Sequence, residues 1–134
     1  MVETVPVVAA VLAILAGLIH VYIFVWESVT WTSERTRATF GVGSEAEALA
    51  TRELAYNQGW YNLFLAAGAI GGAVVGLAAS GTAQTWGAAI MVFATACMAA
   101  AALVLITRNA AMVRAAAVQG VLPLLAVVTA VLLG

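Results

Sequence analysis

The chain has 134 residues, of which 65% are hydrophobic and 8% are charged, and its mean hydropathy is +1.10. A water-soluble domain of this length has too much surface for its volume to hide so much apolar side chain, so the composition excludes a soluble fold. The net charge of −1 provides no basic surface for nucleic acid, and the single cysteine, Cys97, excludes a disulfide within the chain.

Four segments are long and apolar enough to cross a bilayer, which takes about 20 residues per helix. They cover about residues 5–29, 56–78, 84–106 and 115–133. The N-terminal residues 1–4 lack the basic region of a signal peptide, so we expect the first segment to be kept as a span. Because lipid tolerates no open sheet edge, the spans must be helical. The sequence predicts an all-α, polytopic membrane protein, a single domain built as a four-helix transmembrane bundle.

Every basic residue apart from a lone histidine is an arginine, and all of them fall in the connections 30–55 and 107–114: Arg35, Arg37, Arg52, Arg108 and Arg114. Four spans place these two connections on the same side of the membrane. The positive-inside rule makes that side cytoplasmic and predicts that both termini lie outside.

The connection 30–55 is the longest polar segment. Its sequence Ser44-Glu45-Ala46-Glu47 has the form of a capping box, which predicts a helix that starts near Glu45. This helix is either a short interfacial helix or a cytoplasmic extension of the second span.

The second span carries small residues at a spacing of four: Gly68, Gly72 and Gly76. Such a face lets membrane helices approach closely. The sequence leaves open whether the partner helix belongs to the same chain or to a second copy in a homo-oligomer.

Two ionisable residues stand out within the first span. His20, Phe24, Glu27 and Trp31 fall at i, i+4, i+7 and i+11, which is one stripe of a helix. His20 and Glu27 are then separated by roughly 10 Å along the helix, which suits the two ends of a small pocket. Burial of an ionisable group in a span is costly, so its presence indicates a functional site.

Polar side chains also gather where the other spans begin. The second span contributes two adjacent pairs, Asn57 with Tyr61 and Gln58 with Asn62. In the fourth span Gln119 lies one turn inside the same boundary, and Pro123 leaves the Gln119 carbonyl without its helical hydrogen bond. We expect these groups to meet Glu27 in a vestibule that opens to the cytoplasm.

A structural interpretation competes with the functional one. His20 and Glu27 could simply hydrogen-bond to amides of the second span and hold the helices in register. Trp31 could be a residue of the interfacial aromatic belt.

The chain resembles domain-of-unknown-function family 1304, whose members are small bacterial and fungal membrane proteins. The residues that carry the resemblance are Ile19-His20-Val21-Tyr22-Ile23-Phe24, Glu27, Trp31, Phe40, Asn57-Gln58-Gly59-Trp60-Tyr61-Asn62-Leu63-Phe64-Leu65-Ala66-Ala67-Gly68 and Gln119-Gly120-Val121-Leu122-Pro123. The resemblance implies four spans and no stated activity. With the orientation above, it places the chain in the bacterial inner membrane.

The polar residues favour an acid–base enzyme, of an isomerase or epoxide-rearranging type, that acts on a small lipophilic molecule. The predicted catalytic residues are His20, Glu27 and Tyr61, and the predicted substrate-binding residues are Tyr22, Phe24, Trp31, Asn57, Gln58, Asn62 and Gln119. Hydrolysis is disfavoured because no serine or cysteine has a visible base partner.

Three alternatives remain open at this point. His20 could be an axial ligand of a haem iron, although one histidine is a weak signal and no metal site is otherwise indicated. Glu27 and His20 could form the proton site of a small transporter that works as an oligomer. The polar face could instead dock another protein, in which case the chain is an accessory subunit of a membrane complex.

Overall fold

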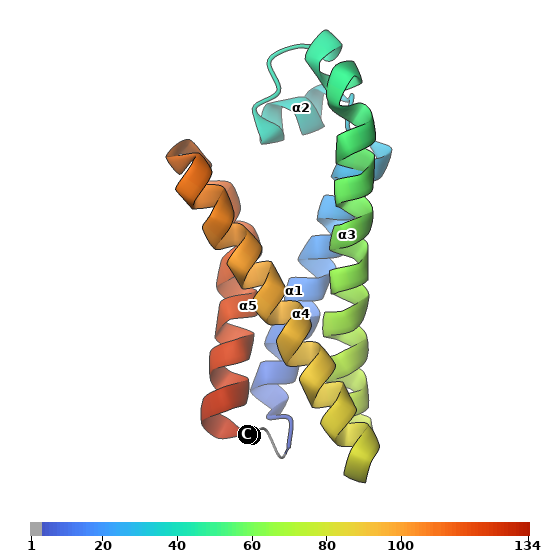
Figure 1. Cartoon of the computed structure of the whole chain (residues 1–134), viewed down its shortest axis with the longest axis vertical. Helices are drawn as coiled ribbons and strands as arrows, with labels where there is room; N and C mark the ends of the chain where they lie inside the picture. The colour runs from blue at the N-terminus through green and yellow to red at the C-terminus, as the bar shows by residue number, and fades with distance from the viewer. Residues whose placement is uncertain (1–3) are drawn as a thin grey trace.

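The structure, a computed structural model, describes residues 4–134 (Figure 1). Residues 1–3, on which the prediction of an uncleaved N-terminus depends, lie outside the described part. The elements in chain order are α1 (Val7–Phe24), the π-helical turn η1 (Val25–Val29), α2 (Glu34–Phe40), α3 (Glu45–Ala78), α4 (Gly81–Arg108), the 3-10 turn η2 (Ala110–Met112) and α5 (Val113–Leu133). The described residues form no strand, which confirms the predicted all-α class.

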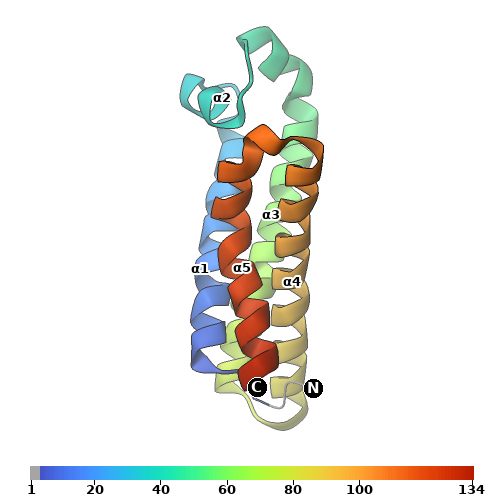
Figure 2. The same cartoon turned by 90° about the vertical axis from the view of Figure 1, so that its left-hand side faces the viewer.

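Four long helices build the molecule, and each is long and apolar enough to cross a membrane. α1 packs between α3 and α5, and α4 packs between the same two helices on the other side, so the four form a closed ring. Figures 1 and 2 show this arrangement from two directions. The predicted four-helix membrane bundle is confirmed.

The two ends of the bundle differ in chemistry. The C-terminus and the α3–α4 turn lie at one end, whereas α2, the start of α3 and the α4–α5 junction lie at the other (Figures 1 and 2). The second group of segments carries all of the arginines, namely Arg35, Arg37, Arg52, Arg108 and Arg114. We call this the arginine-rich end.

Helix α3 is longer than a membrane span requires. Its 34 residues start at the predicted capping box, where Ser44 Oγ accepts a hydrogen bond from the Glu47 N–H at 3.1 Å. The Glu47 carboxylate accepts in return from the N–H of Gly43 at 3.0 Å. Both bonds satisfy backbone donors that a helix start leaves unpaired. The predicted helix near Glu45 is therefore an extension of the second span.

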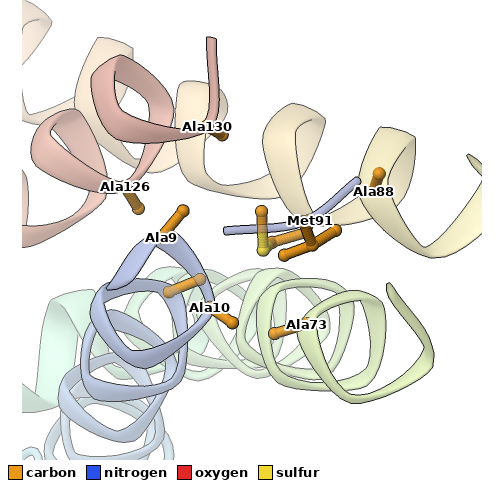
Figure 3. Close-up of a cluster of buried hydrophobic side chains, with 9 residues drawn as sticks. Ala9, Ala10, Ala73, Ala88, Met91, Ala126 and Ala130 are labelled. Atoms are coloured by element: carbon orange, nitrogen blue, oxygen red, sulfur yellow. The ribbon is translucent and has the colours of Figure 1, made fainter. Parts of the chain in front are cut away.

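The core of the bundle is built mainly from alanine. Figure 3 shows Ala9 and Ala10 of α1 facing Ala126 of α5 and Ala73 of α3, with Met91 of α4 between them. Side chains this small allow the helix backbones to approach closely, which favours association in lipid through van der Waals contact.

The glycine stripe of α3 packs against α4 of the same chain. A Cβ added to Gly72 would lie 2.5 Å from the backbone nitrogen of Met91, and one added to Gly87 would collide with the backbone of Gly76. Gly68 is equally placed, since its Cβ would lie 3.1 Å from the Cβ of Ala94. The sequence left open whether the stripe packs on a helix of the same chain or of a second copy. In the structure it packs on α4 of the same chain.

The short helix α2 was not predicted. Ser33 caps its start by accepting a hydrogen bond from the Thr36 N–H at 3.2 Å, and Gly41 ends it at φ 69°, a conformation that favours glycine. The Phe40 ring contacts Trp26 and Trp31 with centroid distances of 5.9 and 5.2 Å. These aromatic contacts hold α2 over the end of α1.

Candidate functional site

The candidate site begins at the π-helical turn η1, where the first span ends. The Thr30 N–H bonds to the carbonyl of Val25, five residues earlier, at 3.0 Å. The Ser28 hydroxyl donates to the carbonyl of Tyr56 in α3 at 2.8 Å. Wide turns of this kind inside helices are frequent at functional sites. The hydrogen bond from Ser28 to the Tyr56 carbonyl holds η1 against α3.

Gly59 makes this close contact possible. A Cβ at position 59 would collide with the Ser28 hydroxyl and would lie 3.1 Å from the Cβ of Glu27. Only glycine leaves space for η1 at this distance from α3. The glycine in the middle of the polar segment Asn57–Asn62 therefore positions Glu27.

Glu27 and Asn62 form the central polar contact between the first two spans. The Asn62 side-chain amide donates to Glu27 Oε2 at 2.7 Å and to the backbone carbonyl of Gln58 at 3.2 Å. Glu27 Oε1 makes no hydrogen bond to a described residue, yet it is not fully buried. One carboxylate oxygen is therefore fixed, and the other remains free to bind or exchange a proton.

His20 lies deeper in the bundle, on the core-facing side of α1. Its side chain is 2% exposed, and its Nδ1 lies 2.8 Å from the carbonyl oxygen of Ala16. Because a carbonyl only accepts, Nδ1 carries the proton, and Nε2 of the neutral ring keeps its lone pair. Nε2 has no hydrogen-bond partner among residues 4–134, and the ring is fully buried in the bundle. The hydrogen bond at Nδ1 therefore leaves Nε2 as the ring atom that could accept a proton or bind a metal ion.

The other polar residues predicted on α3 are exposed. Asn57, Gln58 and Tyr61 lie in the upper part of α3, and Tyr61 is 60% exposed. Tyr61 continues the stripe of Gly68 and Gly72 at helical spacing, so it faces the side on which α4 packs lower down. In Figure 1 the upper half of α4 diverges from α3, which leaves this part of the stripe uncovered.

The predicted aromatic residues do not surround Glu27 as one group. Tyr22 is half exposed and contacts Trp26 at a centroid distance of 4.6 Å, while Phe24 contacts Trp60 at 5.1 Å. Trp31 is not on the stripe of His20 and Glu27, because the helix ends at Val29. Its Nε1 donates to the Thr51 hydroxyl at 3.2 Å.

The fourth span contributes Gln119 beside a broken helical bond. Pro123 lies inside α5 and has no N–H, so the Gln119 carbonyl lacks its usual donor. Gly120 next to it packs on α4, since an added Cβ would lie 2.6 Å from the Cβ of Ala102. No hydrogen bond joins the Gln119 side chain to another described residue, so Gln119 is not brought to Glu27.

The described residues contain no group of three His, Cys, Asp or Glu side chains placed to hold an ion. His20 Nε2 is the atom that would bind a haem iron, and the Nδ1 bond to Ala16 is of the kind that orients such a ligand. Haem binding stays a prediction.

Two contributors were missed in the sequence. The hydrogen bond between Ser28 and the Tyr56 carbonyl joins η1 to α3. The Ser28 hydroxyl occupies the space that a Cβ at position 59 would need, so position 59 has to be glycine. A glycine among amides and aromatic side chains was the available signal, because it often marks a close approach of two backbones. The partner of such a glycine cannot be read from one sequence.

A known protein family matches most of the chain. The family described as "Protein of unknown function (DUF1304)" matches residues 14–131, which include His20, Glu27 and the polar segment Asn57–Asn62. No curated protein and no solved structure matches the chain.

Proposed function

Because the chain belongs to the DUF1304 family, whose function is unknown, we propose a function from its own residues: it is a membrane enzyme that performs acid–base chemistry on a small lipophilic molecule. The observation that carries the proposal is the Glu27 carboxylate, which is held through Oε2 by Asn62 and free at Oε1. A catalytic acid or base needs this combination of fixed orientation and one available atom.

His20 is the second proton carrier of the proposal. Its Nε2 makes no hydrogen bond to a described residue, and the buried ring is fixed by Ala16. Seven residues separate His20 from Glu27, which is roughly 10 Å along the helix and too far for a direct contact. A small substrate lies between the two groups and exchanges a proton with each. Tyr61, on the uncovered stripe of α3, orients a polar group of the substrate.

Isomerisation is the reaction class that these groups serve best. Glu27 protonates the epoxide oxygen, and one C–O bond opens to leave a carbocation. A hydride shifts to this carbon from the neighbouring carbon that bears the hydroxyl. The hydroxyl proton passes to His20 Nε2 and returns to Glu27 before the next turnover. The product is a carbonyl compound of the same mass, and no oxidant is consumed. Hydrolysis through a serine is not supported, since Ser28 donates to a backbone carbonyl rather than to a base.

Transport is less well supported than catalysis. The core residues around Met91 are apolar apart from the buried Thr95, whose hydroxyl donates to the Met91 carbonyl, and none of the described residues there is a buried ionisable group. A proton path across the membrane needs polar groups along its whole length. The site therefore serves molecules that enter from one side or from the bilayer.

The arginine distribution supports an orientation for the site. All arginines lie at the arginine-rich end, and the positive-inside rule assigns that end to the cytoplasm. We place the chain in a bacterial inner membrane with both termini outside. Glu27 then lies near the cytoplasmic boundary.

A screen of lipophilic epoxides tests the proposal. Purified protein in detergent is incubated with a panel of aryl and alkyl terminal epoxides, and the products are separated by gas chromatography with mass detection. We expect at least one epoxide to give a carbonyl isomer of unchanged mass. The Glu27→Gln variant keeps an acceptor for Asn62 but loses the exchangeable proton, so its rate falls at least 100-fold.

The matched control is Glu34→Gln, which removes an exposed carboxylate in α2 that forms no hydrogen bond to a described residue. Its rate stays within twofold of the wild-type rate. Conversion by Glu27→Gln at the wild-type rate, or no isomer from any epoxide in the panel, would contradict the proposal.

A further inference from the structure

A polar groove adjoins the candidate site, between the end of η1 and the first turns of α3. Its volume is about 350 Å³, and neither His20 nor Glu27 lines it. Its polar and aromatic lining residues are Ser28, Trp31, Thr32, Arg52, Glu53 and Tyr56. The proposed acid–base chemistry uses none of these side chains.

The level of the groove relative to the bilayer follows from the length of α3. Its 34 residues extend over about 51 Å at 1.5 Å per residue, whereas the hydrocarbon core is about 30 Å thick. The chain turns at residues 79–80, at the opposite end, so the surplus of about 14 residues projects at the arginine-rich end. Arg52 and Glu53 belong to this surplus and lie in the head-group layer.

The groove presents one positive and one negative group side by side. Arg52 Nε lies 3.9 Å from Glu53 Oε1, which is longer than a hydrogen bond, and the two side chains are 62% and 88% exposed. Each therefore keeps its hydrogen-bonding groups for another partner. A single guanidinium beside a single carboxylate complements a ligand that carries both charges.

The aromatic wall of the groove is held in place before any ligand binds. Trp31 donates from Nε1 to the Thr51 hydroxyl at 3.2 Å, and its ring contacts Phe40. The Tyr56 carbonyl is tied to Ser28, while its hydroxyl forms no hydrogen bond to a described residue. A fixed indole and a free phenol are suited to a cationic group and to a phosphate oxygen.

We propose that this groove binds the head group of a zwitterionic phospholipid of the phosphoethanolamine class. Arg52 binds the phosphate, because guanidinium matches two phosphate oxygens at once. The ammonium group, two carbon atoms away, lies against Glu53 and the face of Trp31. An anionic head group without an amine places negative charge beside Glu53, which disfavours it.

Native mass spectrometry tests the assignment. The protein is reconstituted in vesicles of equal parts phosphatidylethanolamine and phosphatidylglycerol, extracted in mild detergent, and the lipids retained on the protein are counted. We expect at least tenfold more retained phosphatidylethanolamine than phosphatidylglycerol. Arg52→Gln lowers that retention at least tenfold, and Glu53→Gln removes the preference between the two lipids.

The matched control is Arg35→Gln, which removes a charge at the same end of the bundle but outside the groove. It leaves both the amount and the preference unchanged, and circular dichroism of every variant shows the wild-type helix content. Equal retention of both lipids by the wild-type protein, or equal loss from Arg35→Gln and Arg52→Gln, would overturn the proposal. Because Glu27 is not in the groove, either result leaves the proposed enzyme function standing.

Discussion

Replacement of Gly59 by alanine tests whether the close contact between η1 and α3 holds Glu27 beside Asn62. The new Cβ would collide with the Ser28 hydroxyl and would lie 3.0 Å from the backbone nitrogen of Ser28. A hydroxyl can rotate away, but a backbone nitrogen moves only with its whole turn. We therefore expect η1 to be displaced from α3, together with Glu27.

The expected loss of stability follows from three contributions. Overpacking of a tight contact costs about 1–3 kcal/mol. Loss of the Ser28 bond to Tyr56 costs about 1 kcal/mol more. The higher helix propensity of alanine returns about 1 kcal/mol. We expect Gly59→Ala to lower the free energy of unfolding by about 2 kcal/mol.

Gly71→Ala is the matched control on the same helix, because nothing lies within 4 Å of a Cβ added there. It should leave the stability unchanged or raise it by up to about 1 kcal/mol. The assay is reversible unfolding in mixed micelles with increasing dodecyl sulfate, followed by circular dichroism. Equal changes in stability for the two variants would refute the contact between η1 and α3 as its cause.

Three further changes test separate parts of the structure, two in the same unfolding assay and one by hydrogen exchange. Asn62→Ala leaves the Glu27 carboxylate without its bond, and we expect a loss of about 1–3 kcal/mol; no loss would mean that the bond does not form. Gly72→Ala places a Cβ 2.5 Å from the backbone of Met91 and should cost about 3 kcal/mol, against no cost at Gly71. Ser44→Ala removes the cap of α3 and should cost about 1 kcal/mol, seen as faster hydrogen exchange confined to its first turn.

Much of the fold is present in the sequence because its causes are local or set by the bilayer. The four spans follow from length and apolarity, and the start of α3 follows from the side chains of Ser44 and Glu47. Helix α2 has local end signals in Ser33 and Gly41, but a helix of seven residues is not stable by itself. It depends on the contacts of Phe40 with Trp26 and Trp31, which were not predicted. Such contacts between separate segments leave no periodic signal.

The candidate site, too, has features that the sequence predicts and features that depend on contacts between separate segments. The sequence places Glu27 and Asn62 at the same depth, and the structure joins them by a hydrogen bond. A regular helix would also have placed Trp31 on the stripe of His20, but the π-helical turn ends the helix before it. The exposure of Tyr61 depends on how far α4 diverges from α3, which is a property of the whole bundle.

The central claim is that Glu27 performs chemistry and does not merely hold two helices together. The most direct measurement compares turnover and unfolding free energy of Glu27→Gln on one preparation, with the epoxide that the wild-type protein converts fastest. Glutamine can still accept from Asn62, so we expect a stability within about 1 kcal/mol of wild type and a turnover lowered at least 100-fold. Wild-type turnover, or a loss of turnover that only matches a loss of folded protein, would contradict the claim.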